Sequence, residues 1–317
     1  MIVQPQDMKF DNKKFSMIIS GSPGIGKTTL ALSAPNPILI DFDRGISRVS
    51  ARHRKMTDMV DTYEELLEDM KTEAFSRADT VVIDTGGSFV TYLQDWAMRQ
   101  NPANQQKGGG ISLKGYGAVK AEFNRFTNHL KDVMNKNIIY IFHTVEEKDK
   151  DGSLIQRLLC EGSARNTVWQ PCDLGCFMYM AGNGRKLGFS PTESYFAKGC
   201  FGISGVYDVP TLDDTKPNDF ITKLFDKAKA NIAAESEFFE AERTKYESVM
   251  KDAIEIIGKV NDADSARLAS QSIEKINHVL TSEAEIKALF REKLNEIGVK
   301  WNKKTMRYES VQAEEAE

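Results

Sequence analysis

Residues 21–28, with the sequence Gly-Ser-Pro-Gly-Ile-Gly-Lys-Thr, constrain the fold of this chain more than any other segment. They match the pattern G-x-x-x-x-G-K-[ST] at every fixed position. The apolar run at residues 15–20 is expected to be a buried strand, and residues 29–32 are expected to begin a helix. Glycines let backbone N–H groups turn inward toward phosphate oxygens, and a helix N-terminus adds partial positive charge. The order of strand, loop and helix therefore predicts a nucleotide phosphate site.

The same segment assigns roles to individual side chains. Lys27 is expected to reach the β- and γ-phosphates, and Thr28 is expected to hold Mg²⁺. The alternative is a glycine-rich turn before a helix, which a complete match in the right context disfavours. The predicted nucleotide-binding residues are Gly21, Ser22, Pro23, Gly24, Ile25, Gly26, Lys27, Thr28 and Thr29.

Composition limits the class of protein. The 317 residues carry a formal net charge of −4, so the chain is not a uniformly basic nucleic-acid binder. Any contact with a polyanion must come from local patches. No apolar run approaches the length of a membrane span, and residues 1–15 hold no apolar signal core. We therefore expect a cytoplasmic protein with no membrane partner.

Strand-like and helix-like stretches alternate from about residue 12 to about residue 210, which predicts a parallel sheet covered on both faces. The expected elements are strands at 37–41, 80–84 and 138–143 and helices at 62–75 and 118–135.

The pattern changes after residue 144. Asp-Gly at 151–152 and Asn-Gly at 183–184 are hairpin signals, so an antiparallel extension of the sheet is expected. The predicted domains are a nucleotide-binding domain at 1–218, a helical C-terminal module at 219–310 and an acidic tail at 311–317.

Acidic residues end two of the predicted strands. Asp84 ends the strand at 80–84, at the sheet edge that carries the phosphate loop, and is expected to bind Mg²⁺ directly or through water. The alternative is an Asp that caps the next turn. Asp41 and Asp43 lie at the end of the strand at 37–41, and both are candidates for the general base.

Two further features favour ATP as the nucleotide. The strand at 37–41 intervenes between the phosphate-loop strand and the Asp84 strand, an arrangement typical of ATPases. The guanine-specific pattern Asn-Lys-x-Asp has its nearest match at residues 135–138, which lack the Asp. His143 ends the next strand, where a polar residue can sense the γ-phosphate. Its alternative role is a hydrogen bond to a turn.

Taken together, these residues resemble the RecA-like ATPase core. Residues 38–45, 114–117 and 143–148 are similar to a narrower group, the short phage-encoded RecA-like recombination ATPases, often described as AAA-domain proteins. Some members of that group act in single-strand annealing. The resemblance covers about residues 12–210 and implies a RecA-like P-loop NTPase fold, with ATP and Mg²⁺ as ligands. A phage origin would place the protein in the host cytoplasm.

The resemblance also implies catalytic roles. Asp43 falls where RecA carries its catalytic glutamate and is one methylene shorter, which implies slow hydrolysis. His143 falls where RecA has a glutamine that couples the γ-phosphate to DNA binding. Lys198 falls where RecA-type filaments place a lysine against the ATP of the neighbouring subunit, with Arg185 as the reserve candidate. Cys200 stands where related phage proteins often have a second basic residue.

DNA contacts are expected in three places. Residues 105–117 fall at the first DNA-binding loop of RecA, with Lys107 and Lys114 for phosphates and Tyr116 for stacking, or they form a flexible loop without this role. Residues 144–157 fall at the second DNA-binding loop. A basic and aromatic segment at the end of the chain suits single-stranded nucleic acid, or forms a small hairpin whose tryptophan packs on the preceding helix. Its residues are Lys300, Trp301, Lys303, Lys304 and Arg307, with Tyr308.

The expected function is that of a RecA-like ATPase that acts on single-stranded DNA in phage recombination or replication. It would form a homo-oligomeric ring or filament and could contact other recombination or replication proteins. One alternative is a helicase or motor of the same fold. A second alternative, from another class, is a nucleotide-gated module that recruits partners and hydrolyses little ATP.

Overall fold

The computed structural model describes residues 12–149, 151–161, 164–211 and 216–310. The described residues fall into two compact units, which divide between Ile232 and Ala233. Helix α7 (Phe220–Gly258) begins in the first unit and ends in the second. The predicted acidic tail at 311–317 lies outside the described residues.

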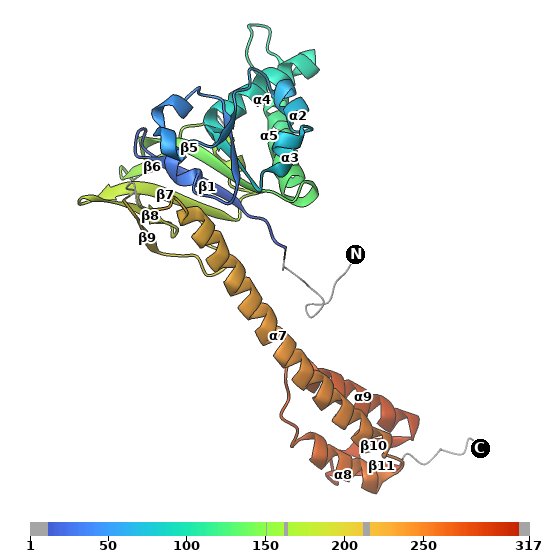
Figure 1. Ribbon diagram of the computed structural model, residues 1–317. Helices are drawn as coiled ribbons and strands as arrows, with labels where there is room; N and C mark the ends of the chain where they lie inside the picture. The colour runs from blue at the N-terminus through green and yellow to red at the C-terminus, as the bar shows by residue number, and fades with distance from the viewer. Residues whose placement is uncertain (1–11, 150, 162–163, 212–215, 311–317) are drawn as a thin grey trace. The chain divides into compact units, whose positions relative to one another are not determined.

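A mostly parallel sheet forms the centre of the first unit (Figure 1), with the strand order β3-β2-β4-β5-β1-β7-β8-β9. Every residue of β1, β2 and β4 is buried, as expected of strands covered on both faces. The parallel strands are β1 (Ser16–Gly21), β2 (Pro37–Asp41), β3 (Met56–Asp58), β4 (Thr80–Asp84), β5 (Asn137–Lys148) and β7 (Leu174–Ala181).

The strand that intervenes between β1 and β4 in the sheet is β5, which pairs in parallel with both. The prediction that residues 37–41 would take this place was wrong, because β2 lies on the far side of β4. Crossover connections allow consecutive parallel strands to be separated in the sheet, so their order along the chain does not give their order in space.

Both predicted hairpins are present and extend the sheet with antiparallel strands. Strand β6 (Leu154–Leu158) pairs with the last residues of β5. Strand β8 (Gly184–Gly188) folds back on β7, and β9 (Val206–Val209) pairs with β8.

Helices cover the two faces of the sheet, and alternate strand residues enter separate cores. In β1, Ile18 packs into the core beneath α4 and α5, whereas Met17 and Ile19 pack into the core beneath α1 and the first turns of α7. The helices of this unit are α1 (Lys27–Ala31), α2 (Tyr63–Asp69), α3 (Glu73–Arg77), α4 (Gly86–Gln100), α5 (Leu113–Asn128) and α6 (Ala164–Thr167). Short 3₁₀ turns occur at Ile46–Arg48, Ala51–His53 and Pro102–Asn104, and a π turn at His129–Val133 follows α5.

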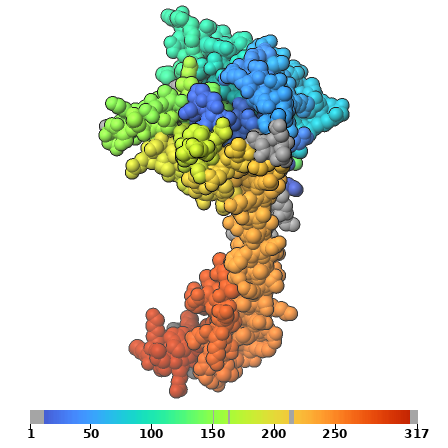
Figure 2. Space-filling model, turned by 60° about the vertical axis from the view of Figure 1, so that its left-hand side comes forward, coloured from blue at the N-terminus to red at the C-terminus, as the bar shows by residue number. Residues whose placement is uncertain are grey.

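The second unit packs α8 (Ala263–Ile273) and α9 (Ser282–Glu296) beside the last turns of α7 (Figures 1 and 2). A hairpin of β10 (Val299–Asn302) and β11 (Arg307–Ser310) follows. The predicted fold class is thereby confirmed: an α/β domain with a mostly parallel sheet and an antiparallel extension, followed by helices. Among the described residues, no helix is both long and apolar enough to cross a membrane.

Candidate functional site

The phosphate loop connects β1 to α1, and two of its glycines are required by local geometry. Gly26 is the N-cap of α1 with a φ of 102°, in the left-handed region that favours glycine. Gly21 has a φ of 151°, and a Cβ there would lie 2.5 Å from the carbonyl oxygen of Met178. The loop therefore keeps close contact with β7. The first N–H groups of α1 have no acceptor within the helix, as an anion site requires.

Lys27 lies beneath this loop and is almost fully buried. Its ammonium donates hydrogen bonds of 2.9 Å to the carbonyl oxygens of both Gly21 and Ser22. Burial lowers the pKa of Lys27 to about 8, and the negative charge of Asp84 opposes that shift. The side chain that the motif assigns to phosphate is thus the cation at the centre of the loop.

His143, at the exposed end of the core part of β5, meets Lys27 directly. The ammonium of Lys27 lies 3.1 Å from Nδ1 of His143. Because an ammonium can only donate, Nδ1 accepts and the imidazole is neutral with its proton on Nε2. Burial lowers the pKa of His143, and the charge of Lys27 lowers it further. The structure therefore brings the predicted sensor to the lysine that the motif assigns to phosphate.

Thr28 and Asp84 meet at the same edge of the sheet. Thr28 Oγ1 donates a hydrogen bond of 2.7 Å to Asp84 Oδ2. Burial raises the pKa of Asp84 to about 6, and the charges of Asp43 and Asp41 add to that rise, while Thr28 and Lys27 oppose it. A hydroxyl and a carboxylate are the hard oxygen ligands that Mg²⁺ prefers. The pair fits the metal site that the sequence predicts.

The two candidate bases differ in their surroundings. Asp41 is fully buried, and its two carboxylate oxygens accept hydrogen bonds of 2.9 and 2.8 Å from the backbone N–H groups of Gly45 and Ile46. Asp43 instead accepts a hydrogen bond from the Ser88 hydroxyl and lines an open cleft of about 770 Å³ together with His143. Of the two, Asp43 lines this cleft, whereas both carboxylate oxygens of Asp41 are held by backbone N–H groups of the following turn. Ser88 was not singled out from the sequence.

A second pocket, of about 220 Å³, adjoins the phosphate loop. Gly26 and Thr29 form one part of its lining, and His53 and Arg185 form another. Arg185 Nε donates a hydrogen bond of 2.8 Å to the carbonyl oxygen of Ile25. Arg185 was the reserve candidate for a contact with a neighbouring subunit, yet its guanidinium is held against the phosphate loop of its own chain.

Lys198 lies far from the phosphate loop of its own chain. It forms an antiparallel bridge with Gly175, which pairs with Ile18 in the middle of β1. The ammonium of Lys198 donates a hydrogen bond to the carbonyl oxygen of Cys172, near the amino end of β1. The phosphate loop follows the opposite end of that strand. The predicted contact with a neighbour's ATP stays a prediction.

The predicted first DNA-binding loop is partly helical. Lys107 is exposed in a turn closed by a bridge between Gln105 and Ile111. Lys114 is exposed in the first turn of α5. Tyr116 is half-buried in α5, where it packs on the core and lines the cleft that holds Asp43. The region predicted as the second DNA-binding loop, 144–157, is the hairpin of β5 and β6.

In the second unit, residues 299–310 form the alternative small hairpin. Trp301 faces Tyr308 across the strands with ring centroids 4.9 Å apart, and Trp301 is 45% exposed. Tyr308, rather than Trp301, contacts Phe290 of the preceding helix. The hairpin therefore leaves its tryptophan accessible, and its exposed cations are Lys300, Lys303, Lys304 and Arg307.

A family model described as an AAA domain matches residues 13–201. The chain belongs to this family. The matched residues comprise the phosphate loop, Asp84, Asp43 and His143, so the AAA domain of this chain is a P-loop ATPase domain. No curated protein matches the chain. Among solved structures, it is similar to the flagellar accessory protein FlaH from Methanocaldococcus jannaschii, with 12% identity and a TM-score of 0.31 over 55% of this chain and 76% of that chain.

Proposed function

We propose that this AAA-domain protein is an Mg²⁺-dependent ATPase that acts on single-stranded DNA in phage recombination or replication. The observation that carries the ATPase proposal is the hydrogen bond from Thr28 to Asp84 beside the buried ammonium of Lys27. Mg²⁺ bound by this pair would neutralise charge on the β- and γ-phosphates. A loop, a cation and an acidic metal ligand at one sheet edge support nucleotide binding as well as hydrolysis.

In the proposed reaction, Lys27 offers positive charge from a site with little water. Its burial strengthens its interaction with an anion, because solvent screens the charge poorly there. The lysine stem is flexible, so the ammonium can exchange its contacts with loop carbonyl oxygens for phosphate oxygens. Whether His143 keeps its contact with Lys27 then depends on whether the ammonium has turned to a bound phosphate. This dependence suits the proposed sensing role.

Asp43 is the proposed general base. It lies in the open cleft with His143, and Ser88 fixes the orientation of its carboxylate. A general base must reach the attacking water. The aspartate side chain is one methylene shorter than a glutamate at the same place and so holds that water less favourably. We therefore propose slow hydrolysis. We also propose that the nucleoside extends from the phosphate loop into the pocket lined by Thr29, His53 and Arg185.

The proposed role on DNA rests on exposed cations and an accessible aromatic ring. In the first unit, the exposed Lys107 and Lys114 offer phosphate contacts. In the second unit, the accessible Trp301 with its neighbouring cations offers a stacking surface. Lys198 is proposed to act on ATP in a neighbouring subunit of a homo-oligomer, as the family resemblance implies. We also propose that the protein contacts other recombination or replication proteins.

The test is a measurement of ATP turnover by the full chain, with and without Mg²⁺ and single-stranded DNA, together with particle size by light scattering. The proposal predicts slow turnover that requires Mg²⁺, rises with DNA and accompanies an oligomer. Turnover that needs no Mg²⁺ would contradict the proposed metal dependence. An equal rate with and without DNA, in a monomer, would contradict the proposed role on DNA and the proposed assembly.

A second candidate function is a nucleotide-gated module that recruits a partner and hydrolyses little ATP. The hydrogen bond between Ser88 and Asp43 favours it, because the Ser88 hydroxyl already occupies one of the carboxylate oxygens that would accept a proton from the attacking water. This candidate predicts tight binding of ATP and Mg²⁺ with very slow turnover that single-stranded DNA does not raise.

A further inference from the structure

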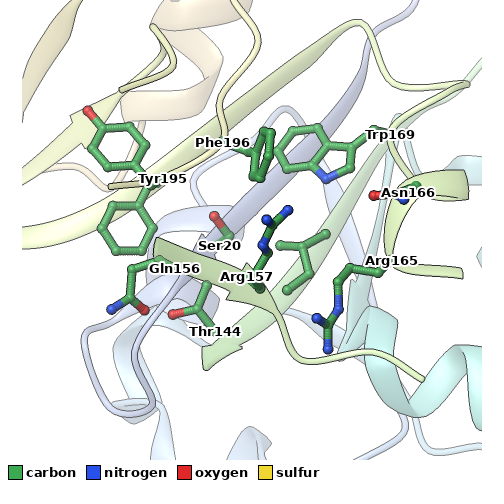
Figure 3. A pocket seen from close by; sticks show the side chains of 11 residues that line it. Ser20, Thr144, Gln156, Arg157, Arg165, Asn166, Trp169, Tyr195 and Phe196 are labelled. Carbon is green, nitrogen blue, oxygen red and sulfur yellow. The ribbon is translucent and has the colours of Figure 1, made fainter. Parts of the chain in front are cut away.

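A pocket of about 250 Å³ lies beneath the hairpin of β5 and β6, and none of residues 21–28 of the phosphate loop belongs to its lining (Figure 3). Four aromatic side chains, two arginines and a threonine are prominent in its lining, which draws on β1, β5, β6, α6, β7 and the segment after β8. In the view of Figure 3, the Phe196 and Trp169 rings lie above the Arg157 guanidinium, and Tyr195 lies to their left. The four aromatic residues of the lining are Trp169, Phe177, Tyr195 and Phe196, and the polar ones named above are Arg157, Arg165 and Thr144.

The aromatic walls are seated by glycines in the neighbouring strands. A Cβ on Gly175 would lie 2.2 Å from the Trp169 ring, and a Cβ on Gly188 would lie 2.1 Å from the Tyr195 hydroxyl. Tyr195 stacks on Phe177 with ring centroids 4.7 Å apart. Rings held this firmly lose little conformational freedom when a flat ligand binds against them.

Two polar atoms in the pocket lining have no protein partner within the described part of the chain. Thr144 Oγ1 and Arg165 Nε are both buried and accept or donate no hydrogen bond there. A buried polar group without a partner is unfavourable, and such groups commonly mark a place where a ligand or water completes the hydrogen bonding. The pocket thus combines flat apolar walls with unused donors.

The charge of the pocket argues against a phosphate as its ligand. Arg165 forms two hydrogen bonds to the carboxylate of Glu147, at 2.8 and 2.9 Å. Arg157 lies 3.9 Å from Asp149 and stacks at 4.9 Å on the Phe196 ring. Both guanidiniums therefore face a carboxylate of the same hairpin. A neutral flat ligand suits this balance better than an anion does.

We propose that this pocket receives one unpaired nucleobase of single-stranded DNA, an inference that rests on the proposed DNA role. A base offers a face for stacking and an edge whose carbonyl or ring nitrogen can accept from Arg165 and pair with Thr144. The volume lies below the range of about 300–1,000 Å³ that holds larger ligands, which favours a single base over a whole nucleotide.

The pocket also lies next to the phosphate site along the chain. Thr144 follows His143, which contacts Lys27, and Arg165 lines the cleft of Asp43 as well as this pocket. The backbone N–H of Leu159, the residue directly after β6, donates a hydrogen bond of 2.8 Å to the carbonyl oxygen of His143. A base inserted in this pocket would therefore lie next to the segment that carries His143, the residue that contacts Lys27.

Binding of a fluorescently labelled oligodeoxythymidylate to the full chain tests this inference, with an abasic strand of the same length as the second probe. Thr144→Val keeps the side-chain shape and removes an unpartnered hydroxyl, so it should not lower fold stability. Phe196→Ala removes a partly exposed ring. Each variant should weaken binding of the base-containing strand by about tenfold. Each variant should bind the abasic strand with the same affinity as the unaltered protein does. Phe238→Ala, an exposed aromatic outside the pocket, is the matched control.

A second readout locates the base directly. An oligonucleotide with 5-iodouracil should photo-crosslink to Trp169, Tyr195 or Phe196, as identified by mass spectrometry. Unchanged affinity of both variants, or crosslinks confined to residues 299–308, would overturn the pocket assignment and leave the ATPase proposal intact. If the unaltered protein binds no oligonucleotide, the base pocket and the DNA role both fail, and ATP turnover of the same preparation shows separately whether the ATPase role stands.

Discussion

Thr28 Oγ1 donates a hydrogen bond of 2.7 Å to Asp84 Oδ2, although the two residues are 56 positions apart in the chain. Thr28 is the second residue of α1, which follows β1 and the phosphate loop, and Asp84 ends β4, which lies two strands from β1 in the sheet. Parallel strands bring their carboxyl ends to one edge, so the fold itself creates this contact. It is the feature from which the proposed metal site follows.

Asp84→Asn should weaken Mg²⁺-dependent ATP binding while the fold is retained. The amide keeps the shape and can still accept from Thr28, but it lacks the charge that attracts a divalent cation. A titration of ATP binding against Mg²⁺ should show a shift of about tenfold or more to higher metal concentration, as expected for loss of one charged ligand. An unaltered Mg²⁺ titration would exclude Asp84 as a metal ligand.

Asp43→Asn should leave ATP binding nearly intact and reduce hydrolysis by about a hundredfold or more, as loss of a general base usually does. Single-turnover and equilibrium-binding measurements separate the two effects. The same measurements on Ser88→Ala test the role of the hydroxyl that donates to Asp43, because this variant leaves the carboxylate without that hydrogen bond. If Asp43→Asn hydrolyses ATP at the unaltered rate, the assignment of the base is wrong.

Asp41→Asn should act on stability instead. The carboxylate of Asp41 accepts two backbone N–H groups in a fully buried site, and an amide can accept only one of them. Denaturant unfolding should show a loss of about 1–3 kcal/mol. Full stability with strongly reduced hydrolysis would reverse the roles proposed for the two aspartates.

The sequence could separate these aspartates only in part. Strand alternation places Asp41 and Asp43 on the same side, but β2 ends at Asp41, so a period of two does not extend to Asp43. The turn that follows directs Asp41 toward Gly45 and Ile46. By contrast, the order of strand, loop and helix around residues 21–28 could be predicted, because eight consecutive residues match one pattern.

Elements that depend on distant contacts were harder to predict. Helix α4 begins with Gly86-Gly87, a pair that indicates a turn, and the structure gives the reason for both glycines. A Cβ on Gly86 would lie 2.4 Å from the Phe142 ring, and one on Gly87 would lie 2.7 Å from the Leu159 carbonyl oxygen. The position of Arg185 beside the phosphate loop likewise follows from the register of β7 and β8, which no local pattern specifies.

Arg185→Ala should weaken ATP binding in an isolated subunit. Its guanidinium contacts the phosphate loop of its own chain and lines the adjoining pocket, so its loss affects that chain's own site. A several-fold rise in the dissociation constant for ATP is expected, with Lys186→Ala as the neighbouring control. Unchanged affinity would show that the adjoining pocket does not hold the nucleotide.

Lys198→Ala should lower turnover while each subunit still binds ATP, because a cation from a neighbour would offset charge that develops on the γ-phosphate. Mixing this variant with Asp43→Asn should restore part of the activity, since some interfaces then combine an intact base with an intact lysine. A monomer with full activity would refute the action of Lys198 on a neighbouring subunit.

Removal of residues 299–317 should reduce affinity for single-stranded DNA without an effect on ATP binding, and Trp301→Ala should reproduce part of that loss. Trp301 is accessible and flanked by exposed cations, which suits base stacking. Affinity is measured at several salt concentrations, because fewer phosphate contacts reduce the salt dependence. DNA binding with the same affinity and salt dependence would show that the hairpin is structural only.

The most direct test of the central claim is ATP binding and turnover by Lys27→Ala, compared with Lys71→Ala, a surface lysine paired with Glu68. Lys27 supplies a buried charge that backbone amides cannot replace. With folding verified by circular dichroism, Lys27→Ala should show no measurable Mg²⁺-dependent binding or turnover, while Lys71→Ala should match the unaltered protein. Unchanged ATP turnover by correctly folded Lys27→Ala would contradict the assignment of the nucleotide site.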